Sequence, residues 1–194
     1  LWNGNVGSYK VPPGNYKATV KVDKDSMTVP FVISKDPNYN ISNQDYEKQF
    51  AFLNAIKNKF DETQKVIKDI RAVRNQLNAL KDKMGDDYPK DLDSLSKGIM
   101  KKLSKIEEHL YQTKARSEQD VLNYPIRLND KLSGVFDAAN QQTAPSQSAI
   151  DAYHDVAEKI DVELSAFKNI LDNDIKNFNK LVREKEIGVI MLKK

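Results

Sequence analysis

Residues 46–84 read YEKQFAFLNAIKNKFDETQKVIKDIRAVRNQLNALKDKM, with an apolar side chain at nearly every third or fourth position. This spacing places the apolar side chains on one face of an α-helix. A helix of that length spans about 60 Å and must bury its stripe against other helices. The stripe consists of Tyr46, Phe50, Leu53, Ile56, Phe60, Ile67, Ile70, Leu77, Leu80 and Met84.

A second stripe with the same period runs from Ile150 to Val182. Two long stripes with a shorter one between them predict an antiparallel bundle of three helical arms. We expect the first helix to begin at Ser42 or Asn43 and to end near Met84. The second arm should run from about residue 91 to 123, break at Pro125, and resume over 128–139. The last helix is expected from about 146 to 186.

Residues 1–40 have a different composition, with glycines and prolines around two strand-like runs at 16–22 and 26–33. Both runs alternate with period two, and residues 23–25 form a turn signal, which predicts a β-hairpin. Pro30 indicates an edge strand or a bulge. The expected fold class is therefore mainly α (α+β), with the hairpin in residues 1–40 packed against a helical bundle in residues 41–194.

The tail at 187–192 is apolar and β-branched. It is interpreted either as a short strand that joins the hairpin or as an extended segment that caps the bundle core. The chain begins with leucine rather than methionine, so we expect it to be a piece of a longer protein.

The composition is that of a soluble globular chain, with 39% hydrophobic and 30% charged residues and a net charge of +3. Acidic and basic residues alternate along the helices, which argues against a nucleic-acid surface. There is no cysteine, which excludes disulfides, thiolate catalysis and the usual zinc sites. No stretch reaches the length of a membrane span.

The sequence offers no constellation of catalytic, metal-binding or cofactor-binding residues. His109 and His154 each lack a second histidine at the i+4 position, so the two-histidine face of a helical zinc site is missing. The carboxylates lie on the outer faces of amphipathic helices rather than across a cleft. No nucleophile motif or phosphate-binding loop is present. We therefore predict no catalytic site, no metal and no cofactor in this chain.

A few polar residues interrupt the apolar stripes or surround the Pro125 break. We interpret them as a structural polar network that ties the break to the long helices. The alternatives are long side chains with their charged ends in water, or a ligand site. The residues are Arg71, Arg74, Arg127, Asn129 and Asn179.

Several segments resemble one family in the same order along the chain. The segment 122–132, LNYPIRLNDKL, resembles the C-terminal region of large bacterial proteins with sortilin-like or BNR-repeat β-propellers, which are labelled glycosyl hydrolases. The segments PGNYKATV at 13–20 and FVISKDP at 31–37 resemble the closing strands of the Ig-like β-sandwich before that region. Residues 70–77 and 178–181 also agree with the family pattern, whereas the tail at 187–190 departs from its usual proline-containing end.

The resemblance implies a non-catalytic C-terminal structural or interaction module of a larger exported protein, in the periplasm or at the cell surface. Its partners would be the upstream propeller and Ig-like domains, or another protein or a glycan. One alternative is an accessory part of a glycan-processing hydrolase whose active site lies upstream. Another is a homodimeric coiled-coil assembly module. Any enzymatic activity would belong to the propeller.

Overall fold

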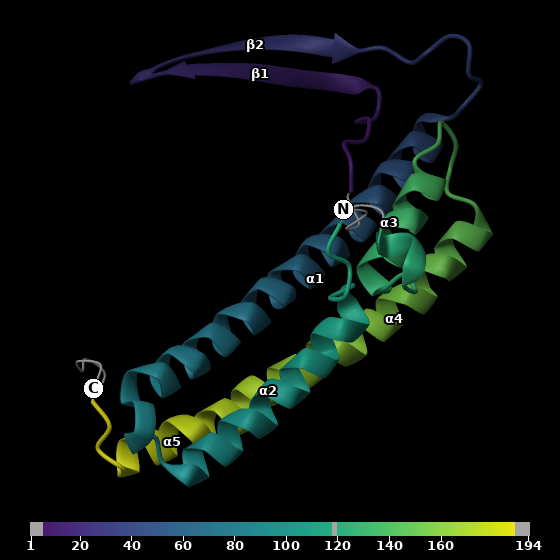
Figure 1. Cartoon of the computed structure of the whole chain (residues 1–194). Helices are drawn as coiled ribbons and strands as arrows, with labels where there is room; N and C mark the ends of the chain where they lie inside the picture. The colour runs from purple at the N-terminus through teal and green to yellow at the C-terminus, as the bar shows by residue number, and fades with distance from the viewer. Residues whose placement is uncertain (1–5, 118–119, 189–194) are drawn as a thin grey trace.

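The chain forms a bundle of helices with a β-hairpin that projects from one end (Figure 1). The structure, a computed structural model, describes residues 6–117 and 120–188. It confirms the predicted fold class. The main elements are β1 (Gly14–Val22), β2 (Asp25–Ile33), α1 (Asn43–Met84), α2 (Lys90–Leu110), α3 (Leu128–Ala139), α4 (Gln147–Asn169) and α5 (Lys176–Glu184).

Helix α1 begins and ends at local signals in the sequence. The Ser42 hydroxyl accepts a hydrogen bond from the Asp45 backbone amide at 3.1 Å, which satisfies one free donor of the first turn. At the other end Gly85 has a φ angle of 57°, a conformation that disfavours side chains with a Cβ. A short 3₁₀ turn, Gly85–Asp87, then leads into α2. The predicted boundaries of this helix are confirmed.

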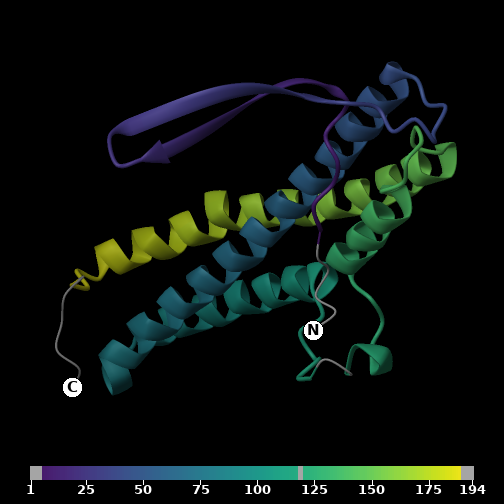
Figure 2. The ribbon, with the colours of Figure 1, turned by 90° about the horizontal axis from the view of Figure 1, so that it is seen from above.

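The helices form three arms around one apolar core (Figure 2). The first arm is α1, the second is α2 followed by α3, and the third is α4 continued by α5. Helix α3 packs against both α1 and α4 at the hairpin end of the bundle. The most deeply buried apolar side chains are Leu53, Ile56, Ile67, Ile70, Leu92, Ile99, Leu103, Leu110, Leu132, Phe136 and Ile160.

The second arm breaks earlier than the sequence predicts. Helix α2 ends at Leu110 rather than near Asn123, and Tyr111 is already extended, with φ −138° and ψ 146°. The apolar repeat stops at Leu110, and the following Gln112 is buried with its side-chain amide donating to the Pro125 carbonyl at 2.9 Å. This contact closes the connection to α3, so Pro125 lies in a loop and does not interrupt a helix.

The third arm contains a π-helical segment, Ile170–Ile175, between α4 and α5. A π turn inserts extra residues into the helical repeat and changes which side chains face the core. Ile170 at the start of this segment is buried, whereas Leu171, which continues the predicted stripe, is only half-buried.

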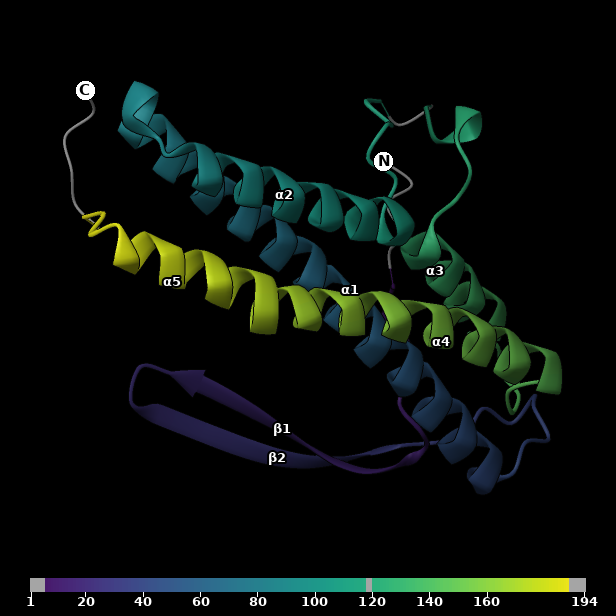
Figure 3. The same cartoon turned by 90° about the horizontal axis from the view of Figure 1, so that it is seen from below.

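The hairpin does not pack against the bundle, which corrects the prediction. Its two strands extend away from the helices and are joined to them only at their open end (Figure 3). Fifteen of its 18 strand residues are exposed. The connection is made instead by the preceding segment, because Val6 and Tyr9 pack against the bundle core.

The outer faces of the helices carry ion pairs between residues four positions apart, such as Lys57–Asp61 on α1 and Asp155–Lys159 on α4. Pairs of this kind stabilise a helix on its solvent-exposed face, and they agree with the alternation of charges along the sequence. Among the described residues, no helix is both long and apolar enough to cross a membrane.

Ion pairs also close the end of the bundle away from the hairpin. Lys81 of α1 lies 2.7 Å from Asp93 of α2, and Lys185 lies 2.8 Å from Asp91. The hydrogen bond from Lys81 holds the pKa of the Asp93 carboxyl below its ordinary value of 3.8. The hydrogen bond from Lys185 does the same for Asp91.

We expect the free energy of unfolding of Asp93→Asn to fall less in acid than that of the wild type. A carboxyl whose pKa is lower in the folded state stabilises the fold fully above its unfolded pKa, and this contribution is lost as the pH falls through the folded value. The urea midpoint of the wild type should therefore drop more than that of the variant between about pH 6 and pH 3. Equal drops in the two proteins would contradict the role of this pair.

Candidate functional site

The candidate site is the hairpin, whose shape follows from its sequence. Strands β1 and β2 alternate apolar and polar residues, and a two-residue turn at Asp23 and Lys24 joins them. Asp23 has a φ angle of 52°, the left-handed conformation that short hairpin turns require. The predicted hairpin is confirmed, with strands that begin two residues and one residue earlier than expected.

The strand register sorts the side chains onto two different faces. Tyr16 pairs with Phe31, Ala18 with Val29, and Val20 with Met27, so these residues share one face. We call this set, with Val22, the apolar hairpin face. The opposite polar hairpin face pairs Asn15 with Val32, Lys17 with Pro30, Thr19 with Thr28, and Lys21 with Ser26.

Neighbouring side chains stabilise the hairpin on both of its faces. The rings of Tyr16 and Phe31 lie 5.9 Å apart across the apolar hairpin face. The hydroxyls of Thr19 and Thr28 are 2.8 Å apart across the polar hairpin face. Such cross-strand pairs contribute to sheet stability, and they fix the register of the two strands.

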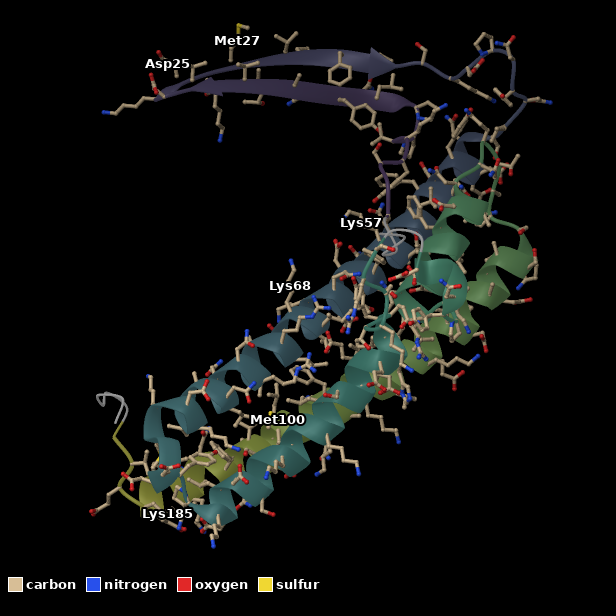
Figure 4. The ribbon with its side chains drawn as sticks, viewed as in Figure 1. Asp25, Met27, Lys57, Lys68, Met100 and Lys185 are labelled. Carbon is tan, nitrogen blue, oxygen red and sulfur yellow. The ribbon has the colours of Figure 1, made fainter. Side chains whose placement is uncertain are left out.

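The apolar hairpin face is open to solvent and turned away from the helices. Met27 is 65% exposed and Val20 59%. Met27 points to the side opposite the bundle, while Lys68 projects from α1 on the side that faces the hairpin (Figure 4). A hairpin of two strands is marginal in water without another layer over its apolar side chains. This face therefore has the chemistry of an interaction surface.

The polar residues singled out in the sequence lie in three separate places. Arg71 and Arg74 of α1 meet at Glu107 of α2, as described below. Arg127 and Asn129 lie at the beginning of α3, where Asn129 is fully buried. Asn179 is exposed on α5. The structure thus brings only the two arginines of this set together around one partner.

The Arg–Glu cluster, defined as Arg71, Arg74 and Glu107, links α1 to α2. Glu107 is only 2% exposed. Arg71 Nε lies 2.6 Å from one carboxylate oxygen, and the Arg74 guanidinium donates to the other. The Arg71 guanidinium also lies over the Tyr111 ring, 5.0 Å from its centroid. Two cations and a ring contact compensate the burial of this carboxylate, which makes the cluster a structural feature of the bundle.

The two histidines are placed on helix surfaces. His109 Nδ1 lies 2.6 Å from a Glu163 carboxylate oxygen, which joins α2 to α4, and His154 is exposed on α4. Within residues 6–117 and 120–188, no group of three metal-ligating side chains comes together.

Sequence reasoning missed two residues that organise the molecule. Glu107 is an exception to the expectation that the carboxylates lie on the outer faces of the helices, because it is buried and holds the two arginines. Tyr9 packs against Phe50 and Phe136, with ring centroids 5.6 and 5.8 Å apart, and its hydroxyl bonds to Asn54. The one hint in the sequence that Glu107 is buried is Arg74, a charged residue at a position of α1 where the repeat predicts an apolar one.

The predicted tail at 187–192 lies mostly outside the described residues, and only its first part is placed. Ile187 packs against the core of the bundle.

Comparison with known proteins gives no relative. No protein-family model, curated protein or solved structure matches the chain.

Proposed function

We propose that this chain is a non-catalytic structural and interaction module of a larger exported protein of the β-propeller type, active in the periplasm or at the cell surface. In this proposal the bundle is a rigid spacer and the hairpin is its docking element. The partner is the Ig-like sandwich and propeller region that the resemblance places upstream. The observation that carries the proposal is the apolar hairpin face, which is exposed and turned away from the bundle.

Within the described residues, no other element packs on the apolar hairpin face. An alternating strand pair normally buries its apolar side in a core, and contiguous exposed apolar patches mark interaction sites. The bundle does not cover this side, because Met27 on it points away from the helices (Figure 4), and the register puts Lys17 and Lys21 on the opposite face of the hairpin. A second β-layer from a partner supplies the missing cover.

The bundle is well suited to hold a docking element at a distance. Helix α1 alone has 42 residues, equivalent to about 60 Å. It is braced along its length by α2, α3 and α4. The segment that precedes the hairpin is held to this arm, because Tyr9 packs against Phe50 of α1 and Phe136 of α3.

The test is a calorimetric titration of this chain against the separately expressed propeller and sandwich region of the parent protein. We expect binding at micromolar concentrations or tighter. Val29→Lys should weaken it at least tenfold, because it puts a charge on the apolar hairpin face. The matched control is Thr28→Lys, which carries the same charge on the opposite face of the same strand and should bind as the wild type does.

Two outcomes would contradict the proposal. One is an absence of binding by a folded, monomeric wild-type chain. The other is an equal loss in both lysine variants, which would show that charge on the hairpin matters but that its apolar face does not. Light scattering gives the oligomeric state of each protein in the same experiment, and a stable wild-type dimer would favour the assembly alternative.

A further inference from the structure

The two free edges of the hairpin differ in their ability to bind another strand. In a hairpin closed by a two-residue turn, the pair beside the turn is hydrogen-bonded, and hydrogen-bonded and non-hydrogen-bonded pairs alternate from there. Val22–Asp25 is the pair beside the turn. Lys17–Pro30 and Thr19–Thr28 therefore occupy non-hydrogen-bonded positions, where backbone groups point outward from the ladder.

The edge of β2 is blocked by Pro30. Proline has no backbone N–H, so the outward edge of β2 lacks a donor in the middle of the strand. The edge of β1 has no such gap, because its outward amides belong to Asn15, Lys17, Thr19 and Lys21. In the described part of the chain, the hairpin is the whole sheet and this edge has no neighbouring strand.

The charge beside the free edge is positive. The outward residues of β1 include Lys17 and Lys21, and the strand contains no acidic residue. Opposite charges in directly opposed positions stabilise a strand pair, and like charges destabilise it.

We propose that the free edge of β1 binds a strand of a partner β-sheet in which acidic and apolar residues alternate. The acidic side chains lie beside Lys17 and Lys21 on the polar hairpin face. The apolar side chains extend the apolar hairpin face next to Ala18 and Val20. This inference rests on the proposed docking role of the hairpin and names the edge and the chemistry of its partner.

A second copy of the chain is a poorer occupant of this edge. Two copies paired through β1 bring lysines together on the polar hairpin face, beside Asn15 and Thr19, and supply no acidic residue to pair with them. Packing of two apolar hairpin faces also covers little surface, because strands of nine residues are about 30 Å long and the pair is about 10 Å wide. That is about 300 Å² per partner, well below the roughly 800 Å² of a stable interface.

The test is an NMR titration of the full chain with a synthetic peptide of nine residues in which glutamate and valine alternate. We expect the amide signals of Asn15, Lys17, Thr19 and Lys21 to shift and to become protected from exchange. The inward amides of Ala18 and Val20 should change less. A peptide of alternating lysine and valine should bind at least tenfold more weakly.

Two proline variants form a matched pair. Thr19→Pro removes an outward donor from β1, and Thr28→Pro removes the outward donor of the residue paired with it on β2. Both lose the same threonine contact, and neither removes an amide that donates within the hairpin ladder. We expect only Thr19→Pro to weaken binding of the glutamate peptide, by about tenfold for a lost hydrogen bond and the clash of the proline ring.

A charge-reversal variant keeps the inference testable if Thr19→Pro disturbs the hairpin. Lys17→Glu/Lys21→Glu should bind the lysine peptide in preference to the glutamate peptide. Equal loss in both proline variants, an unchanged peptide preference after charge reversal, or self-association of the wild type through β1 would each overturn the inference. None of these results bears on binding of the parent region, which tests the proposed function separately.

Discussion

Replacing Phe136 with alanine is expected to lower the free energy of unfolding by about 3–5 kcal/mol. Phe136 is 1% exposed and lies on α3, the helix that packs against both α1 and α4. Its ring also meets Tyr9, whose segment leads to the hairpin. Truncation removes the buried ring and leaves a cavity at the junction of the three arms, which a helix held on two sides cannot collapse to fill.

Urea unfolding followed by circular dichroism measures this loss. The control is Val162→Ala on α4, where the side chain is 62% exposed and the change should stay within about 0.5 kcal/mol. A loss below about 1 kcal/mol for Phe136→Ala would show that α3 is not an essential part of the core. The hairpin should keep its amide signals in both variants, because its strands make no contact with the helices.

The parts of the fold that could be predicted are those that local signals determine. The spacing of the apolar residues, the Ser42 cap and Gly85 all lie within or beside α1, and together they place both its ends. The period-two alternation of β1 and β2 gave the hairpin in the same way. In each case a few neighbouring residues are sufficient, because the free energies of capping and turn formation depend on nearby atoms.

The parts that were wrong depend on contacts between distant residues. Helix α2 stops at Leu110, and Gln112 just beyond it donates to the Pro125 carbonyl across the loop, a contact that no local pattern reveals. The π segment at 170–175 interrupts the helical repeat that the sequence predicts there, and Ile170 is buried while Leu171 of the predicted stripe is only half-buried. The hairpin stands apart from the bundle, with Met27 pointing to the side opposite the helices (Figure 4), a placement that the alternation within the two strands does not determine.

The candidate site was only partly predictable for the same reason. Alternation predicts that the hairpin has one apolar face, but the exposure of that face depends on where the bundle lies. Arg74 was conspicuous as a charge in an apolar stripe, whereas its partner Glu107 resembled any other surface carboxylate of α2. The pairing of Arg74 with Glu107 depends on how α1 packs against α2, and the sequence does not give that arrangement.

Removing both cations from the Arg–Glu cluster should lower the free energy of unfolding more than replacing all three of its residues. Arg71→Ala/Arg74→Ala leaves the carboxylate of Glu107 buried without its two donors, and we expect a loss of about 3 kcal/mol in the free energy of unfolding. Arg71→Met/Arg74→Met/Glu107→Leu replaces the charges with apolar groups of similar volume. It should remain within about 1 kcal/mol of the wild type, because no charge is then left to be desolvated.

The ordering of these two variants separates the contribution of the ion pairs from that of packing. The arginines could act only through the packing of their aliphatic stems. In that case the methionine variant would keep this packing and the alanine variant would lose it, and the residue at position 107 would make no difference. Glu107→Leu in the alanine background decides between the two explanations. A recovery of stability on removal of the carboxylate identifies the buried charge as the cause, and no recovery identifies packing. The exposed pair Lys57–Asp61 on α1 is the reference, since its removal should change the free energy of unfolding far less than removal of the two arginines.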